Sequence, residues 1–339
     1  MSSIKTFISN HTNNNNNNNN SNINCVKINY FNSLIATCGN DGKINIFSYK
    51  NQNLLQTLQN HSDSIWDLSF SFPFKNYGEF LASCGFDNKL NIYKNNNNNF
   101  NVVYSYSHKS SINSCEFCPK EYGIILLCCS SDNSLSLHEL NTKNNNNNNN
   151  YNFVNKCYFT DYVNGINAIS FGPSLIPILF DEDENNENND ENNNINNNNN
   201  NLNPIRFVSA GNNGIIKLYS NDNNNNNNNN NIENFVDENI FKGNSAINKI
   251  NWLKYEGYSF DTIAFGTEEG FLIILKYKEN LWEICDNINV NGIILNICWN
   301  HCGSYLSVGT NDNKNHYYQQ NLEEKFEEVF LNNNNNNIF

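Results

Sequence analysis

The sequence predicts an all-β fold, a β-propeller of six blades. Three observations lead to this prediction: one hairpin pattern occurs six times, a short apolar strand precedes each copy, and asparagine tracts fall between the predicted strands. Each hairpin joins an apolar strand with small residues to a second strand in which apolar and polar residues alternate. The six copies occupy residues 35–47, 81–93, 126–138, 207–219, 263–275 and 306–318. Six units of one kind imply a repeat fold.

A two-residue turn is predicted inside each hairpin. Each turn pair contains Gly or Asn, and most of the pairs tolerate the positive φ that tight hairpin turns demand. The pairs are Asp41-Gly42, Asp87-Asn88, Asp132-Asn133, Asn213-Gly214, Glu269-Gly270 and Asp312-Asn313.

A third strand is predicted before each hairpin, from an isoleucine followed five residues later by a bulky apolar residue. These strands are Ile23–Ile28, Ile65–Phe70, Ile112–Phe117, Ile166–Phe171, Ile247–Trp252 and Ile294–Trp299. A fourth, weaker strand follows most hairpins, as at residues 54–58 and 102–106. Four antiparallel strands per unit, at a period of roughly 40 to 50 residues without insertions, are typical of propeller blades.

The asparagine tracts are expected to lie in loops. A longer surface loop costs only about 0.6 kcal/mol per doubling of its length, whereas an insertion within a strand would break the ladder. We therefore predict an N-terminal segment (1–22), one propeller domain (23–331) and an asparagine-rich tail (332–339), with insertions at 95–99, 144–150, 181–203 and 221–231. Self-association of the tracts is an alternative reading of the same composition.

Composition and charge exclude several classes of function. The net charge of −13, without a basic stripe, argues against a nucleic-acid partner, because affinity for phosphate backbones comes from clustered Lys and Arg. The chain lacks an apolar stretch long enough for a signal peptide or a membrane span, so we expect a cytosolic protein. In that compartment the eleven cysteines are expected to be reduced thiols. Cys38, Cys84 and Cys129 share one small, buried position of the repeat.

A zinc site is the main chemical alternative. The thiols of Cys115, Cys118, Cys128 and Cys129 have the residue type and the first spacing of a zinc knuckle. However, strand residues that are adjacent or three apart point to opposite faces of a sheet, so these four thiols should not converge. We predict neither a metal nor a cofactor, and we find no phosphate loop or paired-carboxylate motif.

Histidines precede the first strand of two blades, and the pattern around them resembles the WD-repeat family. The resemblance implies that such a histidine bonds across its blade to a Ser or Thr and to the turn aspartate, and onward to a Trp. His61, Ser83 and Asp87 match this arrangement with Tyr93 in place of Trp, whereas His108 and Asp132 retain only part of it, and His11 is a candidate for blade one. The predicted network residues are His61, Ser83, Asp87, His108, Asp132, Asp41 and Asp312.

A Ser, His and Asp set also suggests a nucleophilic triad. Every member recurs at a repeat position and the later blades lose it, which favours a structural role. We therefore predict that the chain is not an enzyme.

A more specific resemblance covers blades two to four. Residues 61–93, residues 110–140, and residues 167–177 with 206–219 resemble the second, third and fourth blades of the Sec-thirteen family. The match includes features outside the general WD-repeat pattern, namely Tyr77-Gly78, Tyr122-Gly123, Pro173 and Pro177. Blades five and six match only in outline, the WD dipeptide is absent, and Asn213 and Glu269 replace the turn aspartate.

The resemblance implies an open six-bladed ring that is completed by a blade from an α-solenoid partner. In the family this partner is a large COPII coat subunit of WD-plus-solenoid type, or a nucleoporin with an insertion blade. The implied locations are endoplasmic reticulum exit sites and COPII vesicles, reached through the coat only, and the nuclear pore. The family also serves in a nutrient-signalling complex at lysosomes.

The sequence is compatible with such an open ring. Residues 325–331 can supply a last strand for blade six, so that the N-terminal segment is not required to lock the ring. Unlocked strand edges are templates for strand addition by a partner. The predicted partner edge consists of Ile4, Ile8, Ile23, Ile28, Phe326 and Phe330. A peptide-binding adaptor, which would use the face of the ring instead, is the alternative.

Overall fold

The protein is described here from a computed structural model. The structure describes residues 22–141, 151–160, 164–174, 204–221, 235–254, 261–300, 302–321 and 324–329.

Six four-stranded antiparallel sheets are formed, each from four strands that are consecutive in the chain. Blades one to three are β1 (Ile23–Ile28), β2 (Leu34–Gly39), β3 (Ile44–Ser48), β4 (Leu54–Leu58); β5 (Ile65–Phe70), β6 (Phe80–Gly85), β7 (Lys89–Asn96), β8 (Asn99–Ser107); and β9 (Ile112–Phe117), β10 (Ile125–Ser130), β11 (Leu135–Leu140), β12 (Phe153–Phe159), with a 3₁₀ turn η1 (Lys120–Tyr122). Blades four to six are β13 (Ile166–Phe171), β14 (Arg206–Gly211), β15 (Ile215–Asn221), β16 (Phe235–Lys242); β17 (Ile247–Trp252), β18 (Thr262–Thr267), β19 (Phe271–Lys278), β20 (Leu281–Asn289); and β21 (Ile294–Trp299), β22 (Tyr305–Thr310), β23 (Asn315–Gln320), β24 (Phe326–Glu328).

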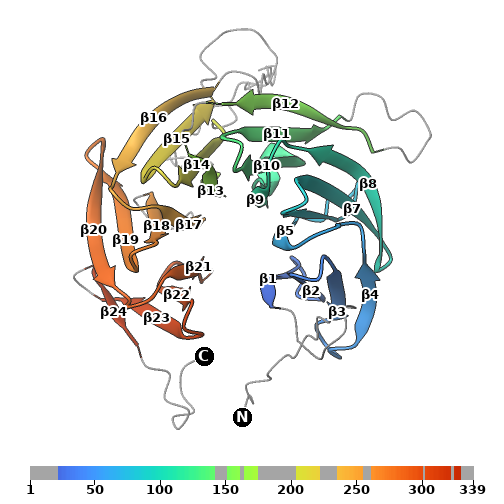
Figure 1. Cartoon of the computed structure of the whole chain (residues 1–339), viewed down its shortest axis with the longest axis horizontal. Coiled ribbons are helices and arrows are strands. Elements are labelled where there is room, and N and C mark those ends of the chain that lie inside the picture. The colour runs from blue at the N-terminus through green and yellow to red at the C-terminus, as the bar shows by residue number, and fades with distance from the viewer. Residues whose placement is uncertain are drawn as a thin grey trace, which may run out of the picture.

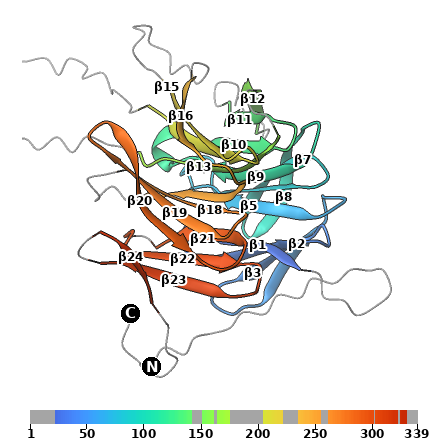
Figure 2. The same ribbon diagram turned by 60° about the vertical axis from the view of Figure 1, so that its left-hand side comes forward.

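The sheets are arranged radially as a six-bladed propeller (Figures 1 and 2). The first strand of each blade lies nearest the centre and the fourth lies at the rim. All six predicted first strands agree with β1, β5, β9, β13, β17 and β21, residue for residue. The all-β, six-bladed fold class is therefore confirmed.

The hairpin turns are longer than the sequence suggested. Cys38 pairs with Ile44 across the first hairpin, so five residues lie between the last paired positions, and the other five hairpins share this spacing. Only the second residue of each predicted pair adopts a positive φ, between 62° and 87°. A turn followed by one left-handed residue gives a hairpin the twist of its strands, which explains Gly or Asn at that place.

The asparagine tract at 95–99 is not a loop insertion. Asn95 and Asn96 belong to β7, Asn99 belongs to β8, and Asn97 and Asn98 form a two-residue turn with φ of 53° and 67°. Asparagine is one of the few residues that tolerate this left-handed conformation, so the tract builds the hairpin. The other predicted insertions lie largely outside the described residues.

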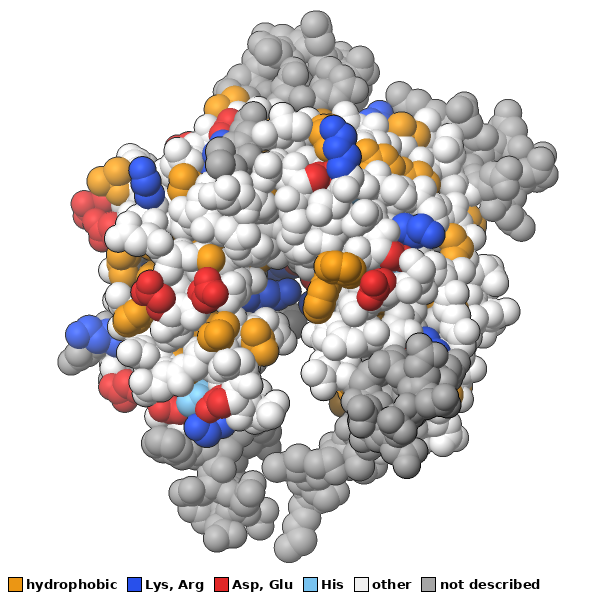
Figure 3. Space-filling model, viewed as in Figure 1, with side chains coloured by type: hydrophobic (Ala, Val, Ile, Leu, Met, Phe, Trp, Pro, Cys, Tyr) orange, Lys and Arg blue, Asp and Glu red, His pale blue; other side chains and the backbone are white. Residues whose placement is uncertain are grey.

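Neighbouring blades are held together by their side chains. Five clusters of buried apolar residues each lie between two consecutive blades, as where Ile44 and Ile46 of β3 pack with Ile65 and Leu68 of β5. In the part of the chain that the structure describes, no such cluster joins blade six to blade one. The ring is open between β1 and β21, as the ribbon and the space-filling surface both show (Figures 1 and 3).

The small position shared by Cys38, Cys84 and Cys129 lies at these junctions. In blade five this position is Gly266, and a Cβ atom there would overlap the Ile294 side chain of blade six. In blade six it is Gly309, where the nearest atom to an added Cβ is 3.4 Å away.

We expect Gly266→Cys to lower the free energy of unfolding by about 1 to 3 kcal/mol, because the added atoms must displace the packed Ile294 side chain. Gly309→Cys is the matched control and should change it by less than about 0.5 kcal/mol. Urea denaturation of both variants would measure this, and equal losses would contradict the packing argument.

Candidate partner-binding seam

The opening between blades six and one, here called the seam, exposes apolar side chains of β1. Ile23 and Val26, the first and fourth residues of β1, are 41% and 50% exposed. In the five other blades, the residues at the same two places are at most 4% exposed. These equivalents are Ile65, Ile112, Ile166, Ile247 and Ile294, and Leu68, Cys115, Ile169, Ile250 and Ile297. β1 thus has the residues of a blade junction without a neighbouring blade among the described residues.

Three of the six residues of the predicted partner edge, namely Ile23, Ile28 and Phe326, lie among the described residues. Ile28, at the other end of β1 from Ile23, is also exposed. Phe326, in contrast, is buried in the core between blades five and six and packs on Trp299, with ring centroids 5.5 Å apart, so its side chain cannot contact a partner. The last strand is shorter than the predicted 325–331. Ile4, Ile8 and Phe330 lie outside the described residues.

The predicted histidine network forms in blade two. His61 Nδ1 lies 2.9 Å from Asp87 Oδ1, and Nε2 lies 2.7 Å from Ser83 Oγ. Because a carboxylate can only accept, Nδ1 donates and Nε2 accepts from Ser83 and from the Asn91 amide at 3.1 Å. Burial acts to raise the pKa of Asp87, but the hydrogen bonds from His61 and from the Ser62 backbone hold it below its ordinary value.

The network of blade three is larger than the sequence indicated. His108 Nδ1 lies 3.3 Å from Asp132 Oδ2, and Nε2 lies 2.8 Å from Ser136 Oγ. Ser136 lies 2.9 Å from His138 Nε2, and the Tyr104 hydroxyl lies 3.1 Å from His138 Nδ1. Ser136 replaces the expected serine of the preceding strand, where this blade has Cys128. Its cross-strand pairing with Cys128 is the signal that could have identified it.

The remaining two network residues lie in turns. Asp41 Oδ1 accepts a hydrogen bond from the Lys43 backbone at 3.1 Å. Asp312 Oδ1 accepts one from Thr310 Oγ1 at 2.5 Å, and Asp312 also pairs with Lys314. His11 lies outside the described residues. The hydrogen bonds of Asp312 thus stay within its own turn.

The four cysteines considered for zinc are divided between two cores. Cys115 and Cys128 lie in the cluster between blades two and three, whereas Cys118 and Cys129 lie in the cluster between blades three and four. Burial raises the pKa of Cys118 and of Cys128 to about 12. Within the described ranges no group of three or more His, Cys, Asp or Glu side chains has the arrangement of a metal site.

Asp67, which the sequence did not single out, connects the inner strands around the central channel. Its carboxylate accepts hydrogen bonds from Ser114 Oγ at 2.6 Å and Cys25 Sγ at 3.3 Å, and lies 3.7 Å from Lys249 Nζ. Burial acts to raise its pKa, but the charges of Lys249 and Lys27 hold it below the ordinary value. Lys or Arg side chains are visible in the central hollow in Figure 3. One buried charge therefore joins blades one, two, three and five.

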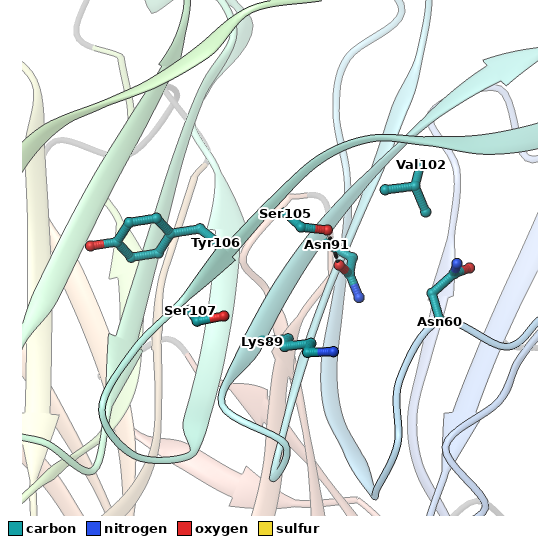
Figure 4. Close-up of a pocket in the computed structure, with 7 residues that line it drawn as sticks. All are labelled: Asn60, Lys89, Asn91, Val102, Ser105, Tyr106 and Ser107. Atoms are coloured by element: carbon teal, nitrogen blue, oxygen red, sulfur yellow. Dashed lines mark hydrogen bonds between the residues drawn. The ribbon is translucent and has the colours of Figure 1, made fainter.

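A hollow of about 360 Å³ lies between blade two and the β4–β5 connection (Figure 4). Asn91 and Ser105 line it, with Lys89 and Asn60 nearby. Ser105 Oγ donates to Asn91 Oδ1 at 2.5 Å, and the Asn91 amide reaches His61. Asn91 and Ser105 of this hollow are thus part of the blade-two network.

Comparison with known proteins agrees with this geometry. Residues 5–48 and 52–94 match the family model "WD domain, G-beta repeat". The chain is 27% identical over 304 residues to "Protein SEC13 homolog" of Drosophila melanogaster, covering 87% of this chain and 77% of that protein. It is 24% identical to "Protein transport protein SEC13" of Yarrowia lipolytica, covering 88% and 92%. "Protein transport protein SEC13-2" of Candida glabrata is also 24% identical, covering 88% and 93%.

The chain is similar to SEC13 proteins over most of its length, and its first two blades match the WD-repeat model. This confirms the predicted Sec-thirteen resemblance and extends it beyond blades two to four. No helix in the described part of the chain is long and apolar enough to cross a membrane.

We expect the stability of the chain to fall as the pH drops below about 6.5. Burial and the neighbouring His108 lower the pKa of His138 to about 3, and burial lowers that of His108. The neutral imidazoles therefore contribute their full stability above the unfolded-state pKa of about 6.5, and this stability is lost as the pH falls toward the folded pKa.

For His138 alone, the loss at pH 5 should be about 2 kcal/mol. Urea midpoints between pH 7 and pH 5 would measure it, and His138→Phe should flatten the curve. A wild-type midpoint that does not change over this range would contradict the assignment.

Proposed function

We propose that the chain is a non-enzymatic scaffold subunit in protein transport that accepts a blade from a partner protein in the seam. The exposure of Ile23 and Val26 carries this proposal, because the same positions are buried wherever a neighbouring blade is present. Two of the relatives are named as protein transport proteins. Covering these two side chains, each about half exposed, would contribute about 0.7 to 1.5 kcal/mol each.

The mode of binding follows from the junctions inside the ring. Described blades meet through the side chains of their faces, so we expect the partner blade to pack by its face against blade one. This replaces strand addition at an edge, which the sequence alone suggested. The partner would occupy the sixth junction of the ring.

Two assemblies fit a protein of this family. One is the COPII coat, with a large WD-plus-solenoid subunit, and the other is the nuclear pore, with a nucleoporin that has an insertion blade. The chain would then lie at endoplasmic reticulum exit sites and vesicles, bound to the membrane through the coat only, or at the nuclear envelope. A lysosomal nutrient-signalling complex is a further assembly of the same class.

Affinity purification of the tagged chain from its own cells at moderate salt, followed by mass spectrometry, would test the proposal. We expect a stoichiometric coat subunit or nucleoporin that contains an α-solenoid. Recovery of a partner that a short peptide displaces would instead support the adaptor function, for which the exposed Trp66 and Phe86 on the ring provide a surface.

Expressed alone, the chain should be poorly soluble, because Ile23, Val26 and Ile28 expose an apolar edge. Co-expression with the insertion-blade partner should increase the soluble fraction severalfold. A chain that is soluble and monomeric on its own, and recovers no partner from lysate, would refute the scaffold function.

A further inference from the structure

The junctions between blades have a direction. The second residue of an inner strand is asparagine in four blades, and its side-chain amide donates to the backbone carbonyl of the first residue in the next inner strand. These bonds are Asn24 to Ile65 (2.8 Å), Asn113 to Ile166 (2.7 Å), Asn167 to Ile247 (3.0 Å) and Asn248 to Ile294 (3.5 Å). Blade two has Trp66 at this position, and blade six has Leu295, which is 58% exposed.

The face that each blade turns toward the next blade, here called the forward face, shows the same difference. Three places on the second and third strands of blades one to five are apolar and buried without exception. They are Ala36, Ile44 and Ile46; Ala82, Leu90 and Ile92; Leu127, Leu135 and Leu137; Val208, Ile216 and Leu218; and Ala264, Leu272 and Ile274. The equivalents in blade six are the half-buried Ser307, the exposed Asn315 and the half-buried Tyr317.

Blade one has kept the complementary face, here called the backward face, in its apolar form. Ile23 and Val26 correspond to residues that pack against the preceding blade at every other junction. Ile35 and Phe47, which are already buried, stand at the positions of Leu81 and Tyr93, which belong to the core between blades one and two. The two sides of the seam therefore differ in chemistry.

We infer that the partner blade is anchored on blade one and makes a more polar, separable contact with blade six, where Leu295 is exposed but the three forward-face places are Ser307, Asn315 and Tyr317. This rests on the proposed function and specifies how the seam is used. Separating an apolar junction exposes buried apolar surface to water, which costs free energy. A contact through Ser307, Asn315 and Tyr317 replaces hydrogen bonds to water by hydrogen bonds to the partner, so it adds little net binding free energy. The completed ring can then open at blade six while the partner remains bound.

The partner is thereby defined by its chemistry. Its forward face, which meets Ile23 and Val26, should be apolar and should have an asparagine or another side-chain donor at the second place of its inner strand, to reach the carbonyl of Ile23. Its opposite face should be polar. Such a blade resembles blades four and five of this chain on one side only.

Two matched substitutions test the inference in the full chain co-expressed with the solenoid partner recovered by purification. Val26→Asp and Leu295→Asp each place a carboxylate on an exposed side chain of an inner strand at the seam, so neither should unfold the ring. We expect Val26→Asp to reduce partner recovery at least tenfold and Leu295→Asp to reduce it less than threefold. Circular dichroism and the thermal midpoint of each variant serve as the folding control.

Hydrogen exchange of the complex provides a second measurement. Amides of β1 should be protected by the partner, and those of β21 and β23 should exchange nearly as in the free chain. Equal losses from both substitutions, or a larger loss from Leu295→Asp, would overturn the inference while leaving the proposed function intact. If the wild-type chain binds no blade-containing partner, or forms a dimer that Val26→Asp abolishes, both proposals are refuted.

Discussion

The constraint on which this structure depends is that a propeller blade has two faces and can bury neither alone. Five apolar clusters satisfy this constraint between successive blades, and each draws its residues from both neighbours. Asp67 adds a buried polar tie across the inner strands. Six blades in a closed ring would need a sixth cluster. Where the ring is open, apolar residues of β1 in blade one stay exposed, and a partner can recognise this surface.

The fold was predictable because every signal it needs is local. A first isoleucine with a bulky residue five places later identified all six inner strands, since both positions face a core in blades two to six. The turn length was misjudged because the two residues that carry the turn signature are only part of a five-residue connection. The tract at 95–99 was wrongly assigned to a loop. Its composition alone could not distinguish a loop from a hairpin, because asparagine occurs in both the strands and the turn here.

The site was predictable only in outline. Ile23 and Ile28 were identified from a family resemblance, but the burial of Phe326 depends on Trp299 and on the core it completes, contacts between residues distant in sequence. His138 and Ser136 were not predicted, because the serine hydroxyl of the blade-three network comes from the third strand of the blade, whereas in blade two it comes from the second. The apparent triad in blade two is explained by position as well: Ser83 and His61 are buried between strands, with their hydrogen bonds committed to each other, to Asp87 and to Asn91. The three residue types are those of a catalytic triad, but their geometry is that of a buried hydrogen-bond network that joins strands of one blade.

The hairpin built by Asn95–Asn99 has a consequence for how this gene can vary. In a loop, changes in the length of such a tract would be absorbed. Here Asn96 pairs with Asn99 across a two-residue turn, so one additional asparagine would shift β8 by one residue and turn its side chains to the opposite face. Phe100, fully buried beside Gln56 of blade one, would leave its core. Changes by two residues would merely lengthen the ribbon, so this tract should vary in length by even steps.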